Sequence, residues 1–124
     1  MAAKAGTEMT ARAVRTAAQA QRIVKQRGLD YVKVGVFDTD GVLRGKFMGA
    51  EKFFSALKHS GFGFCDVVLG WDSADQLYDN ASYTGWHTGY PDAQVRILPD
   101  SCREQPFDFD GRGLLFLCEF AGSP

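Results

Sequence analysis

Residues 31–48 contain the pattern that most narrows the possible folds, because two extended segments flank a short turn sequence. In the first segment, Val32, Val34 and Val36 alternate with aromatic, charged or glycine residues, as in a strand with one buried face. The next four residues, DTDG, are of the types preferred in tight turns, and residues 42–48 are again extended in character. We therefore expect a hairpin.

A helix is predicted before this hairpin. Residues 10–27 are rich in Ala and lack Pro, which favours helix. Thr7 or Thr10 could cap its start, and Gly28 lies where a left-handed residue would end it.

A second helix and further strands are predicted after the hairpin. Residues 51–59 place Phe53, Phe54 and Leu57 on one helical face, and Gly61 ends that helix. Two more strands are predicted at residues 94–98 and 113–120, separated by the turn-rich residues 99–112. This order predicts an α+β domain with a mixed or antiparallel sheet.

Length and charge exclude several classes of protein. A chain of 124 residues has room for one domain, not for separate nucleotide, metal and substrate domains. The net charge of −1 gives no general attraction for nucleic acid, and no segment is apolar enough to span a membrane. Six basic residues and one acidic residue fall within residues 1–27, as in a surface helix or, alternatively, a transit peptide.

The three cysteines, Cys65, Cys102 and Cys118, are odd in number and have no CxxC spacing. They indicate neither a disulfide framework nor a zinc site, so we expect a reducing cytoplasm.

Residues 70–90 form a long polar segment with interspersed aromatics and no regular period. Loops of this length in a compact domain are usually functional or disordered. The aromatic residues Trp71, Tyr78 and Trp86 argue against plain disorder, because such side chains tend to pack against a surface.

The strand that ends in DTDGVL resembles the first motif of haloacid dehalogenase-like phosphatases. That resemblance implies Asp38 as nucleophile and Asp40 as general acid beside a magnesium ion. The alternative is a hairpin turn, since Asp and Gly are common turn residues. Residues 44–48 look like a returning strand, and the later phosphatase motifs have no evident counterparts, which favours the turn.

Extended to DGVLRGK (residues 40–46), the same segment resembles the first hairpin of glutamine synthetase-like ligases, including γ-glutamyl-polyamine synthetases. Other segments follow in the order found in that family. They are the helix KFFSAL (52–57), the loop GWDS (70–73), the segment YPD (90–92), the strand and turn VRILPD (95–100) and the closing strand at residues 114–120. The resemblance covers about residues 29–120.

The resemblance implies a β-grasp fold for residues 29–124, a curled mixed sheet holding one helix. The N-terminal helix expected from composition precedes it, within residues 1–28. It also implies a catalytic domain outside this chain that binds ATP, two Mg or Mn ions and glutamate. Ammonia or an amine is joined there to the glutamate γ-carboxylate. We expect this chain to bind no cofactor or metal itself and to be inactive alone. Its expected partner is a catalytic domain of the same or a neighbouring subunit, in a homo-oligomeric ring.

The resemblance also implies the site residues. Asp72 matches the loop aspartate that binds and deprotonates ammonium in the family, and it is the expected catalytic residue. Asp72, Ser73 and Trp86 are the expected substrate-binding residues. The sequence DSAD at residues 72–75 replaces the family's usual DGSS, and an acidic, aromatic loop would suit a larger organic amine.

A different class of function stays open. A free β-grasp domain could act as a binding or regulatory module that pairs with a catalytic subunit through an edge strand or the aromatic loop. His87, beside Trp86, could orient a substrate or be an ordinary surface residue.

Overall fold

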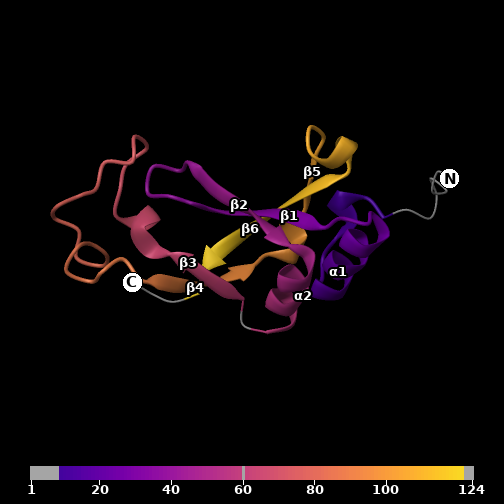
Figure 1. Ribbon diagram of the computed structural model, residues 1–124, viewed down its shortest axis with the longest axis horizontal. Coiled ribbons are helices and arrows are strands. Elements are labelled where there is room, and N and C mark those ends of the chain that lie inside the picture. The colour runs from indigo at the N-terminus through magenta and orange to yellow at the C-terminus, as the bar shows by residue number, and fades with distance from the viewer. Residues whose placement is uncertain (1–8, 60, 122–124) are drawn as a thin grey trace.

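The computed structural model describes residues 9–59 and 61–121, which form one mixed sheet with two α-helices on the same side (Figure 1). The strand order is β2-β1-β6-β4-β3, and β5 pairs with β6. The strands are β1 (Tyr31–Phe37), β2 (Leu43–Gly49), β3 (Phe62–Cys65), β4 (Asp92–Ile97), β5 (Arg103–Gln105) and β6 (Gly113–Phe120). The helices are α1 (Ala17–Gln26), α2 (Ala50–Lys58) and the short 3-10 helices η1 (Ala11–Ala13), η2 (Asp66–Leu69), η3 (Pro99–Ser101) and η4 (Phe109–Gly111).

The predicted hairpin is confirmed. β1 pairs with β2 in antiparallel register from Tyr31 opposite Gly49 to Phe37 opposite Leu43. The three alternating valines of β1 are at most 1% exposed, so the period of two correctly identified the buried face.

The sheet is mixed because β1 and β6 run parallel, whereas the other pairs are antiparallel. It is also curled, so that strands far apart in the strand order approach each other. Lys46 of β2 lies 5.1 Å from the ring centre of Phe62 and 5.3 Å from that of Phe64, both in β3. A curled mixed sheet with helices on one side is the α+β, β-grasp architecture expected from the sequence.

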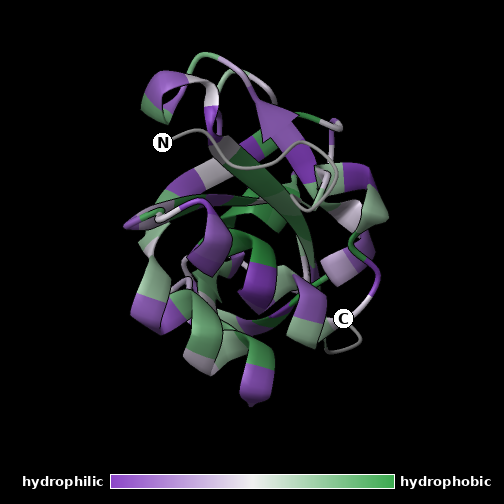
Figure 2. Ribbon diagram, turned by 90° about the vertical axis from the view of Figure 1, so that its right-hand side faces the viewer, coloured by the Kyte–Doolittle hydropathy of each residue, from purple (hydrophilic) through white to green (hydrophobic). Residues whose placement is uncertain are grey.

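The core fills the space between the sheet and the two helices, where the apolar residues gather in Figure 2. Phe53 of α2 is fully buried, and its ring centre lies 4.8 Å from that of Phe116 in β6. Burying one such side chain contributes about 1.5–3 kcal/mol. The prediction that α2 buries Phe53 and Phe54 is confirmed.

The N-terminal helix starts later than predicted. α1 begins after Thr16, not near Thr7 or Thr10, and Thr7 lies outside the described residues. Thr16 and Gln19 form a reciprocal capping box, which fixes the first residue of the helix. The Ala-rich composition before and after Thr16 gives no indication of this boundary. The end agrees with the prediction, since Gly28 has a φ of +62° and follows the last helical turn.

Two short strands were not predicted. β3 and β5 have four and three residues, too few to show a clear alternation. Both are stabilised by pairing with a longer neighbour. β3 pairs with β4, about thirty residues later in the chain, whereas β5 pairs with β6 across the short connection at residues 106–112. Within the described part of the chain, no helix is long and apolar enough to cross a membrane.

Candidate functional site

The long loop between η2 and β4 projects from one end of the molecule, on the left of Figure 1. A buried hydrogen bond fastens its base: the Thr84 hydroxyl, which is fully buried, donates to a carboxyl oxygen of Asp66, which is 4% exposed. The Asp66 amide also donates to the Pro91 carbonyl at 3.0 Å. The loop is therefore anchored to the domain at a buried polar pair.

The first part of the loop is folded into a tight turn by Asp72. Its Oδ1 accepts hydrogen bonds from the amides of Ala74 (2.9 Å) and Gln76 (3.0 Å). The Asp75 amide donates to the Asp72 carbonyl at 3.0 Å, and Asp75 has a φ of +63°. This geometry fixes the direction of the half-buried Asp72 side chain.

The turn packs against the tip of the β1–β2 hairpin through Arg44. Its Nε donates to Asp38 Oδ2 at 2.9 Å, its Nη1 lies 2.7 Å from Asp75 Oδ1, and its Nη2 donates to the Asp72 carbonyl at 3.3 Å. The guanidinium carbon lies 4.9 Å from the ring centre of Trp71. One arginine thus contacts both the hairpin and the loop.

Asp38 is held as an ionised acceptor at the hairpin tip. Desolvation raises the pKa of Asp38, but hydrogen bonds donated by the Val42 amide, the Arg44 guanidinium and the Asp40 amide together outweigh it and hold the pKa below its usual value. The same contact with Asp38 raises the pKa of Arg44.

This geometry favours the turn over the phosphatase motif. Asp38 Oδ1 accepts from the Asp40 and Val42 amides, and Oδ2 accepts from Arg44, so the carboxylate of Asp38 is already engaged. The chain returns at once as β2, as a hairpin requires. In the described residues, no three His, Cys, Asp or Glu side chains converge to hold a metal ion.

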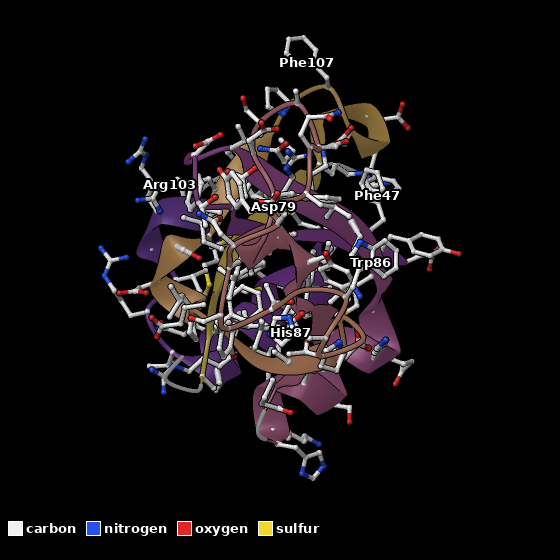
Figure 3. The ribbon with its side chains drawn as sticks, turned by 90° about the vertical axis from the view of Figure 1, so that its left-hand side faces the viewer. Phe47, Asp79, Trp86, His87, Arg103 and Phe107 are labelled. Atoms are coloured by element: carbon white, nitrogen blue, oxygen red, sulfur yellow. The ribbon has the colours of Figure 1, made fainter. Side chains whose placement is uncertain are left out.

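The expected substrate-binding residues lie in two parts of the loop. Ser73 is exposed, and its amide donates to Asp40 Oδ2 at 2.7 Å, beside Asp72. Trp86 is 81% exposed, projects outward in Figure 3, and packs edge-on against Tyr90 at 5.2 Å between ring centres. His87 Nε2 lies 3.0 Å from the Ser82 carbonyl oxygen, within the same loop.

Sequence reasoning missed Arg44 as a member of this site. The hairpin sequence could have indicated Arg44, because this residue follows the acidic turn at a spacing that places it beside Asp38 on the returning strand. Its contacts with residues 71–75 could not be predicted, since they depend on how the long loop folds back onto the hairpin.

Two polar groups of the loop are buried without a hydrogen-bond partner among the described residues. They are Trp71 Nε1 and the Tyr90 hydroxyl.

Comparison with known proteins gives consistent results. No family model matches the chain. The chain is 46% identical over 93 residues to type-1 glutamine synthetase 2 of Dictyostelium discoideum, and the aligned region covers 75% of this chain and 17% of that protein. It is 39% identical over 77 residues to glutamate–isopropylamine ligase of a Pseudomonas species, covering 62% of this chain and 16% of that protein.

Solved structures of GmaS have a similar fold. Apo GmaS without ligand superposes with a TM-score of 0.56 at 18% identity, over 84% of this chain and 21% of that chain. A GmaS–ADP complex gives a TM-score of 0.55 at the same identity, over 85% and 21%. The chain spans about a sixth of the length of the two curated relatives. The sequence identity and the shared fold together identify the chain as a glutamine synthetase-like N-terminal domain.

Proposed function

We propose that this chain is the amine-side domain of an ATP-dependent ligase that joins ammonia or an amine to the γ-carboxylate of glutamate. The observation that carries the proposal is the 46% identity to a protein named glutamine synthetase. The second relative is named for isopropylamine, which supports an organic amine as acceptor. Because the chain spans about a sixth of these relatives, we assign ATP, Mg or Mn and glutamate to another part of the enzyme.

Asp72 is the residue that we assign to the amine. Among the described residues, its side-chain hydrogen bonds all reach Oδ1, which leaves Oδ2 for a cationic substrate. A carboxylate attracts an ammonium ion and can accept its proton, which generates the neutral amine that attacks an activated carboxyl group.

The charge around Asp72 supports this assignment. Asp38, Asp40, Asp72, Asp75 and Arg44 all take part in the contact between hairpin and loop, so this cluster has a formal charge of −3. Within it, the carboxylates of Asp38 and Asp75 contact the guanidinium of Arg44. A negative cluster at an exposed loop raises the local concentration of cations. Asp38 and Asp75 balance Arg44, so its charge does not cancel that of Asp72.

Trp86 and Ser73 complete the proposed amine site. The exposed Trp86 ring offers a face for cation–π contact with an alkylammonium ion, and Ser73 is next to the catalytic carboxylate. We place this loop against the active site of a neighbouring subunit in a homo-oligomeric ring, with the chain inactive alone. The free cysteines Cys65, Cys102 and Cys118 suit a reducing cytoplasm.

The alternative function is a stand-alone binding or regulatory module. The exposed loop aromatics are the observation that favours it, because exposed apolar side chains often mark contact surfaces. The two functions differ in whether the chain can supply part of a working active site.

A chimera tests the proposal. The region of the Dictyostelium relative that matches this chain is replaced by this chain's residues, and formation of γ-glutamyl amide from glutamate, ATP and either ammonia or isopropylamine is measured. We expect the chimera to be active, and both the relative lacking that region and the 124-residue chain alone to be inactive. A folded chimera that makes no γ-glutamyl product with either amine would favour the binding module.

A further inference from the structure

The turn at residues 38–41 connects β1 to β2, and its side chains also hold the loop that contains Asp72. The Thr39 hydroxyl donates to the Trp71 carbonyl at 2.9 Å, and Asp40 Oδ2 accepts from the Ser73 amide at 2.7 Å. Arg44 adds its contacts with Asp75 and with the Asp72 carbonyl. The hairpin and the loop, about thirty residues apart in sequence, are thus joined by several polar contacts.

Arg44 is itself fixed from the hairpin side. The Asp38 side chain is fully buried, and two backbone amides of the turn bind its Oδ1. Its Oδ2 therefore meets Arg44 Nε from a fixed direction. Because the guanidinium is planar, fixing Nε also fixes the directions of Nη1 and Nη2. Here Nη1 reaches the Asp75 carboxylate and Nη2 reaches the Asp72 carbonyl.

The loop side of the contact is more exposed. The side chain of Asp75 is 57% exposed, whereas that of Arg44 is 20% exposed. An ion pair at that exposure contributes little by itself. Its effect comes from joining the buried carboxylate of Asp38 to the exposed turn that contains Asp72, so that losing it frees this turn more than it destabilises the domain.

We propose that Arg44, oriented by Asp38, is a positioning residue that fixes the Asp72 carboxylate against the tip of the β1–β2 hairpin. Arg44 acts through the loop and does not touch the amine. The part of this inference that concerns amine binding rests on the proposed function, whereas the part that concerns loop order does not.

Amide hydrogen exchange in the 124-residue chain tests the structural part by NMR. The reporters are the amides of Ala74 and Gln76, which donate to Asp72 Oδ1. We expect Arg44→Ala to speed their exchange at least about tenfold, because it removes together the contacts of Arg44 with Asp75, the Asp72 carbonyl and the Trp71 ring. Arg44→Lys keeps the charge but not the fork and should give an intermediate rate.

Arg96→Ala is the matched control, because Arg96 also forms an ion pair through Nε, at 2.7 Å, but with Glu119 of β6 and not with a residue of the loop. It should change the two reporter rates less than twofold. Exchange within β6 reports whether each variant remains folded. If Arg44→Ala destabilises β6 as well, Asp75→Asn becomes the deciding variant, since it removes only the loop side of the ion pair. Reporter rates within twofold of the parent in a folded variant would overturn the proposal.

The chimera tests the functional part. Arg44→Ala should raise KM for the amine about tenfold and leave KM for glutamate within twofold, and Arg44→Lys should recover part of the loss. An equal loss for both substrates would indicate a general structural defect and overturn the positioning role. If Asp72→Asn retains full activity, the proposed function fails, while the exchange rates still decide whether Arg44 fixes the loop.

Discussion

The hydrogen bond between Thr84 and Asp66 is the buried anchor of the long loop, and Thr84→Val removes it. Val has nearly the shape of Thr, so no cavity forms, but the Asp66 carboxyl, 4% exposed, loses its partner. An unpaired buried acceptor costs about 1–3 kcal/mol. Burying the added methyl recovers at most about 0.8 kcal/mol. Subtracting this recovery leaves an expected fall in the free energy of unfolding of about 0.2–2.2 kcal/mol, centred on about 1 kcal/mol.

Urea unfolding of the parent and the variant measures this loss, and limited proteolysis reports local opening of the loop. If the loop opens locally, water reaches the Asp66 carboxyl, so the loss in unfolding free energy cannot exceed the free energy of that opening. Such opening would appear as faster cleavage of the loop by the protease. Thr88→Val is the matched control, because Thr88 hydrogen-bonds only to Gly85 at an exposed position in the same loop. A double-mutant cycle with Asp66→Ala should give a coupling of at least about 0.5 kcal/mol. An unfolding free energy within about 0.3 kcal/mol of the parent, with unchanged cleavage, would refute the anchoring role.

Three further predictions concern the fold, the pH dependence and the cysteines. Gly61→Ala should destabilise the domain by more than about 2 kcal/mol in urea unfolding, because φ is +99° and the new Cβ would clash with the backbone carbonyl oxygen of Val95 in β4. A smaller loss would mean that the chain is not tightly packed where β3 begins. The pKa of Asp38 is lower in the folded state, so its contribution to stability is complete above its ordinary value of 3.8 and is lost as the pH falls below it. Asp38→Asn should therefore reduce the slope of unfolding free energy against pH below about pH 4, and an unchanged slope would contradict this. Burial raises the pKa of Cys102 and Cys118 to about 12, so native protein should react with a thiol reagent at Cys65 first, as mass spectrometry of the labelled peptides would show; equal labelling of all three would contradict it.

The β1–β2 hairpin and the buried face of α2 could be predicted from short stretches of sequence. The alternation in β1 and the DTDG turn define a hairpin without help from the rest of the chain, and its bounds were predicted within one residue. The buried face of α2 followed from the spacing of its phenylalanines. The parallel pairing of β1 with β6 could not be derived in this way, because it joins segments about eighty residues apart. β5 was missed for another reason, since its three residues are too few to show an alternation.

The candidate site was predictable only in part. The acidic, aromatic composition of residues 70–90 drew attention to the loop, and the family resemblance pointed to Asp72. Neither predicted that Asp72 would be held by its own turn and by Arg44, because the sequence does not say which hairpin residue faces the loop. The start of α1 was misplaced for a similar reason: Thr10 and Thr16 are equivalent in type, and only the partner Gln19 distinguishes them.

The rate of γ-glutamyl amide formation by the Asp72→Asn chimera tests the central claim most directly. Asparagine keeps the size and the turn-forming oxygen of Asp72 but cannot attract the ammonium charge or accept its proton. We expect the rate to fall by a factor of about 10²–10⁴, the usual contribution of a general base. Asp30→Asn, which removes an exposed carboxylate just before β1, at the end opposite the hairpin tip, should leave the rate within twofold. An Asp72→Asn chimera as fast as its parent would contradict the claim that this domain supplies the base for the amine.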